Sequence, residues 1–307
     1  MNILRKLVIN AAILLAIVFI VDLTVGRTLR YFYFRETSGQ HRRITHALEE
    51  TEAQLVVFGA SRASRHYVPE VFAAELDMTC YNAGMEGNGI YYQLAVLRSI
   101  LLRHRPEVVV LDFDGVAKGR RSPESYGYLS CLLPYYQAHQ EIRDIIELRG
   151  RFERVKLCSE IYPFNSKILT IAIGNMPLNK ARHVEDRGYV PLTNVWADDR
   201  QTVLQPVVEA DSQKVACYNE FFTRCAQAGV RVFLVCSPTF FKIEGPGIAS
   251  HFSELHLPSG VCIRDFSRDE LFNDRILFND PGHLNHHGAV IFSRLVASEM
   301  KAVMKSN

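Results

Sequence analysis

The stretch Gln54-Leu-Val-Val-Phe-Gly-Ala-Ser61-Arg-Ala-Ser-Arg-His-Tyr67 decides how this chain folds. Its four consecutive apolar residues, Leu55 to Phe58, are typical of a short buried strand that ends at a glycine. Gly59 permits a sharp turn of the backbone, and Ser61 follows where the strand gives way to a loop and then a helix. Pro69 suits the first turn of that helix.

A serine directly after a buried strand stands at the carboxyl edge of a sheet, where open α/β folds bind their ligands. A single Gly-x-Ser is nevertheless much more often a plain turn than a nucleophile. The stretch also differs from the Gly-x-Ser-x-Gly elbow of α/β-hydrolases, because Ala63 stands in place of the second glycine. Ser61 alone therefore leaves a structural and a catalytic interpretation open.

A second stretch, near the other end of the chain, favours the catalytic interpretation. The sequence Asp280-Pro-Gly-His283-Leu-Asn285 precedes an apolar-periodic segment from about Ala289 to Met304, which predicts a closing helix. A serine nucleophile needs a base to take its proton, and the base needs a carboxylate to fix its tautomer and stabilise its charged form. Asp280 and His283 supply both if their loop lies beside Ser61.

With both stretches in view, the chain resembles the SGNH (GDSL-like) hydrolase family. In that family the nucleophile follows the first strand, and an Asp-x-x-His pair precedes the last helix. The resemblance covers roughly residues 52–114 and 210–304, and the two motifs stand in the family's order. It implies a flavodoxin-like sheet and a triad of Ser61 as nucleophile, His283 as base and Asp280 as the carboxylate that orients it.

The resemblance also implies an oxyanion hole. The backbone amide of Ser61 is its first donor. Residues 82–89 form a glycine-rich loop, where backbone amides come close to a ligand, and Gly87 takes the place of the second donor. A plain strand-to-helix turn is the alternative interpretation of this loop.

The third donor of the family is an asparagine after the central strand, and here the chain departs from the pattern. Aligned from Leu111, the position holds Asp114. An ionised carboxylate accepts hydrogen bonds and cannot donate them. Either Asp114 is kept protonated by burial, or Asn82 or Asn88 donates instead, or the hole lacks one donor. We expect a weakened or rearranged hole.

Strand-like and helix-like segments alternate along the chain, which indicates an α/β fold with a doubly wound parallel sheet of about five strands and helices on both faces. The strand-like runs are Leu55–Phe58, Met78–Tyr81, Val108–Leu111, Val230–Val235 and Val261–Phe266, and the helix-like segments include 90–105, 211–229 and 289–304. The domain is expected to occupy residues 52–307. Residues 116–210 break the rhythm and predict an insertion that covers the site as a cap or lid, or packs at the periphery.

The N-terminus predicts a membrane anchor. Leu7 to Gly26 is a run of twenty mostly apolar residues, interrupted by Asn10, Asp22 and Thr24. That length can span a bilayer core of about 30 Å. A cleaved signal peptide and a buried core helix are the alternatives, but no convincing Ala-x-Ala cleavage site follows the run. We expect residues 1–30 to form an uncleaved, single-pass N-terminal transmembrane helix.

The sequence carries opposing signals for the side of the membrane on which the domain lies. Five arginines follow the run and outnumber the basic residues before it, which by the positive-inside rule would place the domain in the cytoplasm. Seven cysteines without a paired spacing also favour a reducing compartment. However, large domains after an N-terminal anchor are often exported whatever their flanking charge. Anchored members of the resembled family usually work outside the cytoplasm, and we expect an extracytoplasmic domain.

The resemblance implies an esterase that cleaves O-acyl esters, such as acetyl esters of cell-envelope or exported polysaccharide, through an acyl-serine intermediate and without a cofactor. The same triad serves an O-acyltransferase when a sugar hydroxyl replaces water, and an inactive glycan-binding protein is a further alternative. The 35 basic and 33 acidic residues nearly cancel, so nothing suggests a nucleic-acid partner.

A metal site is the competing interpretation of the second stretch. Asp280, His283, His286 and His287 offer clustered oxygen and nitrogen ligands. This interpretation leaves Ser61 without a role, and the last two histidines are expected to turn into the closing helix. We therefore expect no metal.

Overall fold

The computed structural model describes residues 3–116, 126–176, 187–198, 203–204, 209–243 and 248–305. It contains two compact units. The helical unit comprises Met1–Thr45 and Leu129–Val184, and the sheet unit comprises His46–Tyr128 and Glu185–Asn307.

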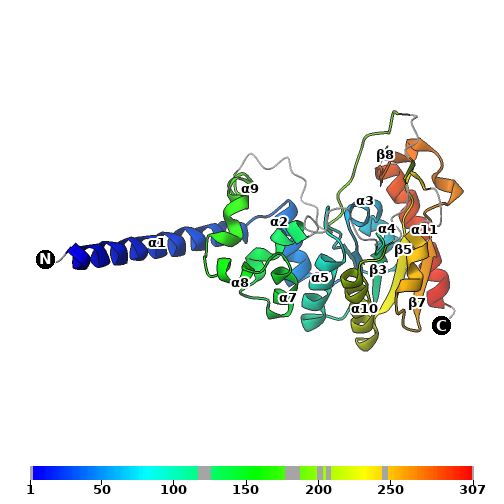
Figure 1. Ribbon diagram of the computed structural model, residues 1–307. Helices are drawn as coiled ribbons and strands as arrows, with labels where there is room; N and C mark the ends of the chain where they lie inside the picture. The colour runs from blue at the N-terminus through cyan, green and yellow to red at the C-terminus, as the bar shows by residue number, and fades with distance from the viewer. Residues whose placement is uncertain are drawn as a thin grey trace. The chain divides into compact units, whose positions relative to one another are not determined.

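The sheet unit is built on a five-stranded parallel sheet with the order β2-β1-β3-β5-β7 (Figure 1). The strands are β1 (Leu55–Phe58), β2 (Cys80–Asn82), β3 (Val108–Asp112), β5 (Arg231–Cys236) and β7 (Val261–Asp265). Every residue of β1 and β3 is buried, as their unbroken apolar runs predict for strands covered on both faces. Two short pairs lie outside this sheet: β4 (Val203–Leu204) with β6 (Lys242–Ile243), and β8 (Phe278–Asp280) with β9 (His283–Leu284).

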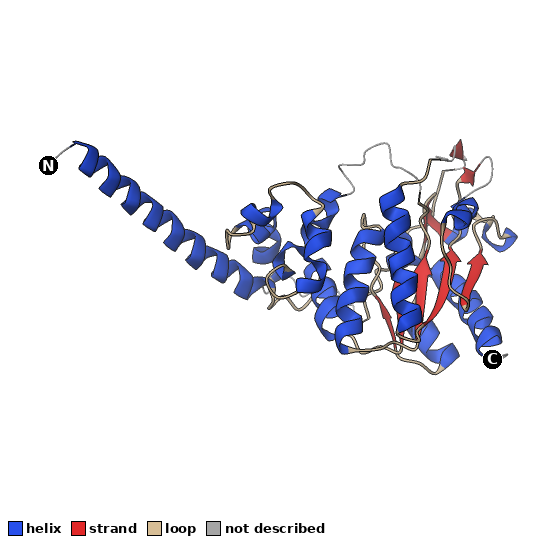
Figure 2. Ribbon diagram, turned by 60° about the horizontal axis from the view of Figure 1, so that its bottom comes forward, coloured by secondary structure: helices blue, strands red, loops and turns tan. Residues whose placement is uncertain are grey.

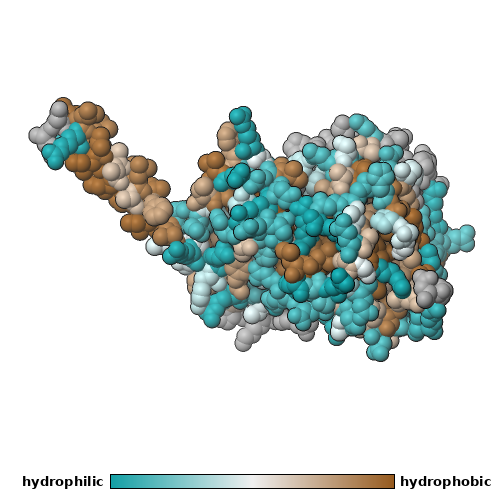
Figure 3. Space-filling model, turned by 90° about the horizontal axis from the view of Figure 1, so that it is seen from below, coloured by the Kyte–Doolittle hydropathy of each residue, from teal (hydrophilic) through white to brown (hydrophobic). Residues whose placement is uncertain are grey.

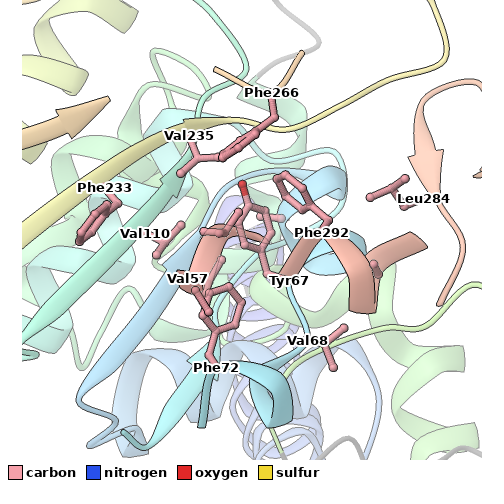
Figure 4. Close-up of a cluster of buried hydrophobic side chains, with 14 of the residues drawn as sticks. Val57, Tyr67, Val68, Phe72, Val110, Phe233, Val235, Phe266, Leu284 and Phe292 are labelled. Atoms are coloured by element: carbon pink, nitrogen blue, oxygen red, sulfur yellow. The ribbon is translucent and has the colours of Figure 1, made fainter. Parts of the chain in front are cut away.

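Helices cover both faces of this sheet (Figure 2). Along β1, Val57 faces a core cluster that includes Phe72 and Phe292 (Figure 4). The next residue, Phe58, faces the other way and its ring meets that of Phe221. The helices of the first face are α3 (Ser61–His66), α4 (Pro69–Leu76) and α11 (His286–Lys305), and those of the second are α5 (Ile90–Arg103) and α10 (Ser212–Gln227). The unit also contains a π-helical turn, His46–Glu50, and 3-10 turns at Ile248–Glu254, Glu270–Phe272 and Arg275–Leu277.

Local signals set most of these boundaries as predicted. Asp211 caps α10 by accepting hydrogen bonds from the amides of Gln213 and Lys214. The predicted strands and helices of this unit begin and end within about two residues of the observed ones, except at two places. The helix that was predicted with Pro69 in its first turn is α4, and an additional short helix, α3, begins at Ser61 itself, where a loop was predicted. The closing helix starts at His286, three residues before the predicted Ala289, because the Asn285 side chain accepts from the Gly288 amide and acts as its cap.

The helical unit contains α1 (Ile3–Tyr33) and a set of short helices. These are α2 (Gln40–Thr45), α7 (Arg143–Glu147), α8 (Glu153–Lys156) and α9 (Ile168–Gly174), with 3-10 turns at Tyr128–Tyr135, Gln140–Ile142 and Tyr162–Lys167. The end of α1 is buried in this unit, where the ring of Tyr33 packs against Tyr135 and Phe164. Among the described residues, α1 alone is long and apolar enough to cross a membrane.

The predicted insertion, residues 116–210, is thus shared between the two units. Its part from Leu129 to Val184 groups with the N-terminal helix, and its end groups with the sheet. Residues 117–125, 177–186, 199–202 and 205–208 lie outside the described residues. The expectation that the insertion covers the site as a lid stays a prediction.

Candidate active site

The turn after β1 presents Ser61 at the carboxyl edge of the sheet. Gly59 has a φ of +147°, and a Cβ there would lie 2.6 Å from the Ala63 Cβ and 2.9 Å from the Asp112 Cβ. Only glycine fits this close approach between β1, α3 and β3. The chain therefore turns sharply and begins α3 with Ser61 as its first residue.

Asp280 and His283 face each other across the β8–β9 hairpin, whose turn is Pro281-Gly282. The sequence predicted a loop here, and the structure shows a tight antiparallel turn instead. Asp280 Oδ1 accepts a hydrogen bond of 2.9 Å from the Gly282 amide. His283 Nδ1 lies 2.9 Å from Oδ1 and 3.1 Å from Oδ2 of the same carboxylate.

The hairpin brings His283 to Ser61. His283 Nε2 lies 2.8 Å from Ser61 Oγ, although the two residues are 222 positions apart in the chain. The three predicted side chains therefore stand in one hydrogen-bonded line: hydroxyl, imidazole, carboxylate. This arrangement lets the imidazole take the hydroxyl proton while the carboxylate holds the ring in the required tautomer.

The Asp280 carboxylate is held in its ionised form. Partial burial acts to raise the pKa of Asp280, but hydrogen bonds from the Gly282 amide and the His283 ring outweigh it. The pKa therefore lies below its ordinary value. The carboxylate is thus available to stabilise the imidazolium that forms when Ser61 loses its proton.

His66, which the sequence patterns did not indicate, joins the β8–β9 hairpin to α3. Its ring is fully buried, and its Nε2 accepts a 2.9 Å hydrogen bond from the amide of Leu284, the residue after His283. Burial, followed by the nearby Arg62 charge, lowers the pKa of His66 well below its ordinary value. The ring is therefore neutral, and it carries its proton on Nδ1 because Nε2 is the acceptor. No local pattern distinguishes this histidine from a surface one.

His66 gives a first prediction, which compares His66→Gln with His66→Leu. Glutamine places an oxygen near the position of Nε2 and still accepts from the Leu284 amide, whereas leucine leaves that amide unpaired. We expect His66→Leu to lower kcat by about tenfold or more with little change in KM, since a loosened base costs orientation rather than binding. His66→Gln should recover most of that loss. Equal losses in kcat and thermal stability for both variants would show that the ring only fills space.

Two backbone amides remain as the predicted oxyanion donors. The amides of Ser61 and Gly87 donate to no other group among the described residues. Gly87 has a φ of +74°, and a Cβ there would lie 2.7 Å from the Tyr128 ring, so the position requires glycine. The assignment of both amides to an oxyanion stays a prediction.

The structure separates the candidates for the third donor. The amide group of Asn82 donates to the carbonyls of Ala63 and Tyr67, at 2.8 Å each, so both of its N–H bonds are already used. Asp114 is exposed to solvent and accepts a hydrogen bond from the Tyr218 hydroxyl. Asn88 is buried in the glycine-rich loop, and its side-chain nitrogen lies 3.2 Å from the Glu86 carbonyl. Asn88 and Asp114 therefore stay the candidates.

A second prediction distinguishes Asp114 from Asn88. If Asp114 occupies the place of the third donor, its charge repels the oxyanion, and Asp114→Asn adds a donor there. We then expect turnover of an activated ester to rise by about tenfold or more, a fraction of what one such donor contributes. If Asp114→Asn leaves turnover flat while Asn88→Ala destroys it, the third donor belongs to the glycine-rich loop.

Asp112 is a buried carboxylate next to the Gly59 turn that precedes Ser61. It ends β3, is 1% exposed, and accepts from the Tyr67 hydroxyl at 3.0 Å and the Ser237 amide at 3.2 Å. Its other oxygen lies 3.6 Å from Arg62 Nε. Burial raises the pKa of Asp112 despite the Arg62 charge. A carboxylate that ends an otherwise apolar strand was visible in the sequence, but its partners were not.

The metal-ligand interpretation gains no geometric support. His286 and His287 are exposed at the start of α11, and His286 Nδ1 lies 3.1 Å from the Tyr189 hydroxyl. In the part of the chain that the structure describes, no three His, Cys, Asp or Glu side chains gather closely enough to hold a metal ion.

Comparison with known proteins adds no family to this picture. No protein-family model, curated protein or solved structure matched the chain.

Proposed function

We propose that this protein is a membrane-anchored serine esterase of the SGNH type. The observation that supports the proposal most strongly is the 2.8 Å contact between Ser61 Oγ and His283 Nε2, with the Asp280 carboxylate on the other ring nitrogen. The two segments that provide these groups are 222 positions apart in the sequence and adjacent in the structure. Their order along the chain is that of the resembled family.

The chemistry follows from the line of three groups. Ser61 Oγ attacks the carbonyl carbon of an ester while its proton passes to His283 Nε2, and Asp280 stabilises the imidazolium. The tetrahedral intermediate then collapses, and the leaving alcohol takes the proton from His283. Water attacks the acyl-serine with His283 again as base, releases the carboxylic acid and restores Ser61.

The architecture supports the same proposal. The strand order β2-β1-β3-β5-β7 is the order of flavodoxin-like, doubly wound sheets, which bind ligands at the carboxyl ends of their strands. Ser61 stands at that edge, directly after β1. The hydroxyl of Ser64, the other serine of the stretch, is buried and bonded to Glu86 and to the Ser61 carbonyl, which leaves Ser61 as the reactive residue.

The proposed substrates are O-acyl esters, above all acetyl esters of cell-envelope or exported polysaccharide. This choice rests on the anchor and on the family resemblance. Transfer of the acyl group to a sugar hydroxyl would use the same acyl-serine and differs only in the second step. Incubation with an acylated donor and an acyl-free glycan, followed by mass spectrometry of the glycan, distinguishes the two reactions.

The experiment that tests the enzyme itself is covalent labelling. The full-length protein in detergent is treated with a serine-reactive fluorophosphonate, and the adduct is located by mass spectrometry. We expect the adduct on Ser61, with labelling retained in Ser64→Ala and lost in Ser61→Ala and His283→Ala. A folded protein that carries no adduct on Ser61 would favour the glycan-binding alternative.

The proposed location is the extracytoplasmic side of a membrane, and this gives a third prediction. A reporter that is active only after export, fused after Asn307, should be active. A reporter that works only in the cytoplasm should be silent at the same position. The reverse result would place the domain in the cytoplasm, as the five arginines after the apolar run indicate when they are counted literally.

A further inference from the structure

The apolar part of α1 is short when it is measured between its charged ends. Fifteen residues lie between Lys6 and Asp22, and at 1.5 Å per residue they extend about 22 Å. The hydrocarbon core of a bilayer is about 30 Å thick, so a span that starts at Leu7 reaches its far edge near Gly26. A bilayer around α1 therefore extends to the level of Asp22 and Gly26.

Asp22 and Gly26 are also among the residues through which α1 contacts the rest of the helical unit, together with residues at its end such as Tyr33. The Asp22 carboxylate accepts hydrogen bonds from the Ser159 hydroxyl and from the amides of Glu160, at 2.8 Å, and Ile161, at 3.3 Å. At Gly26 the Glu160 backbone approaches so closely that a Cβ would collide with it. These contacts fix residues 159–161 at the edge of the hydrocarbon. Three donors to one carboxylate also explain how a charge is tolerated at that depth.

The surface beside this junction is apolar and exposed. Phe152 directly precedes α8 and is 61% exposed, and Val155 lies within α8 and is 69% exposed. In α9, which contains no charged residue and packs against α1, Leu169 is 73% exposed and Ile168 and Ile173 are also exposed. Figure 1 shows α8 and α9 beside the end of α1, and Figure 3 shows the apolar surface of α1 extending to this unit.

We propose that these five side chains form a membrane-seating face that lies in the interfacial zone of the bilayer spanned by α1. The occupant is lipid rather than a partner protein, because the face continues the lipid-exposed surface of α1 at the depth that Asp22 fixes. Arg151 and Arg154 are exposed next to Phe152 and Val155, and Arg154 also pairs with Glu147 at 3.4 Å; long basic side chains at such positions can extend to the headgroups. The helical unit then contacts the membrane surface directly, in addition to being attached to it through α1.

Depth-dependent quenching of tryptophan fluorescence tests whether the membrane-seating face contacts lipid. In a Trp196→Phe background, single tryptophans are introduced as Val155→Trp and Leu169→Trp on the face, Ile17→Trp in the span, and Asp144→Trp at an exposed position of α7. The full-length variants are placed in nanodiscs of plain lipid, of lipid brominated near the top of its acyl chains, or of lipid brominated near the ends of its acyl chains, which reaches the tryptophan at position 17 about 15 Å below the surface. We expect tryptophans at 155 and 169 to lose about half of their emission to the shallow bromines, as interfacial side chains do, and the one at 144 to lose little.

Two results would overturn the proposal. If the tryptophan in the span is quenched and those at 155 and 169 are not, the face is covered by water or protein. If the tryptophan at 144 is quenched as strongly as that at 155, the contact is not specific to this face. If the deep bromines also leave the Ile17→Trp variant unquenched, the anchor itself is refuted, on which the proposal rests.

The proposal does not depend on the chemistry of Ser61. Turnover of an activated ester by the same variants in detergent is measured in parallel. If the variants keep wild-type turnover but the tryptophans at 155 and 169 are not quenched, only the membrane contact of the face is refuted. If those tryptophans are quenched but the protein shows no turnover, the membrane contact is supported and the result counts against the esterase.

Discussion

Replacing Ser61 by alanine is expected to abolish turnover of an activated ester, with a loss of roughly 10⁵–10⁶-fold in kcat. The hydroxyl that attacks the ester is then missing, and His283 has no proton to take. His283→Ala should cost about as much, because a hydroxyl without its base is a weak nucleophile at neutral pH. The double variant should be only slightly worse than either single one, since the two groups act as one unit.

Steady-state kinetics of the four proteins provide the test, with folding checked by circular dichroism. Ser64→Ala is the matched control, because it removes a serine hydroxyl three residues away that the proposed mechanism does not use. It should keep most of the activity. Losses that add on a logarithmic scale, so that the double variant is far worse than each single one, would argue against a shared serine mechanism.

Asp280→Asn is expected to lower kcat by about 10⁴-fold while the protein stays folded. The carboxylate accepts from His283 Nδ1 at 2.9 Å and so keeps Nε2 free to face Ser61 Oγ. An asparagine amide can donate to Nδ1 instead, which moves the ring proton to Nε2 and prevents the ring from acting as base. Asp280→Ala, which cannot donate to the ring, is the comparison. A loss below about tenfold for both would remove Asp280 from the triad.

The same substitution changes how stability depends on pH. The folded-state pKa of Asp280 lies below its ordinary value of 3.8, so its ionised form stabilises the fold at all pH values above that ordinary value. This stabilisation is lost as the pH falls through the lower, folded-state pKa. Denaturant titrations should therefore show wild type more stable than Asp280→Asn at neutral pH, and the difference should disappear in acid. A difference that grows in acid would have the wrong sign.

Much of the sheet could be predicted because its signals are local. Four buried residues in a row and a following glycine were enough to place β1, and the interval between Asp211 and Gly229 was enough to place α10. Predicting that Ser61, His283 and Asp280 meet needed one further piece of information, the order of the two motifs along the chain. The structure brings Ser61, His283 and Asp280 together as that order predicts.

What the sequence left undetermined depends on contacts between distant residues. Asp22 and Ser159 are 137 positions apart, and the hydrogen bond between them helps to join α1 to the helical unit. The helices of that unit are mostly shorter than two turns, so they carry no periodic signal to predict them. Asp114 could be aligned with the family's asparagine, but its partner Tyr218 lies 104 positions away and no local pattern indicated it.

The 222-residue separation of Ser61 and His283 also bears on how the protein is made. A ribosome completes β1, β2 and β3 long before the hairpin that carries His283 and before α11, which packs against α3 and α4. Such a distant contact forms late, because the entropy cost of ordering the intervening chain comes before the contact stabilises the fold. A nascent chain therefore holds its serine without a base until the last residues emerge. If the chain is the proposed esterase, the onset of ester cleavage during synthesis marks the moment at which the sheet unit is complete.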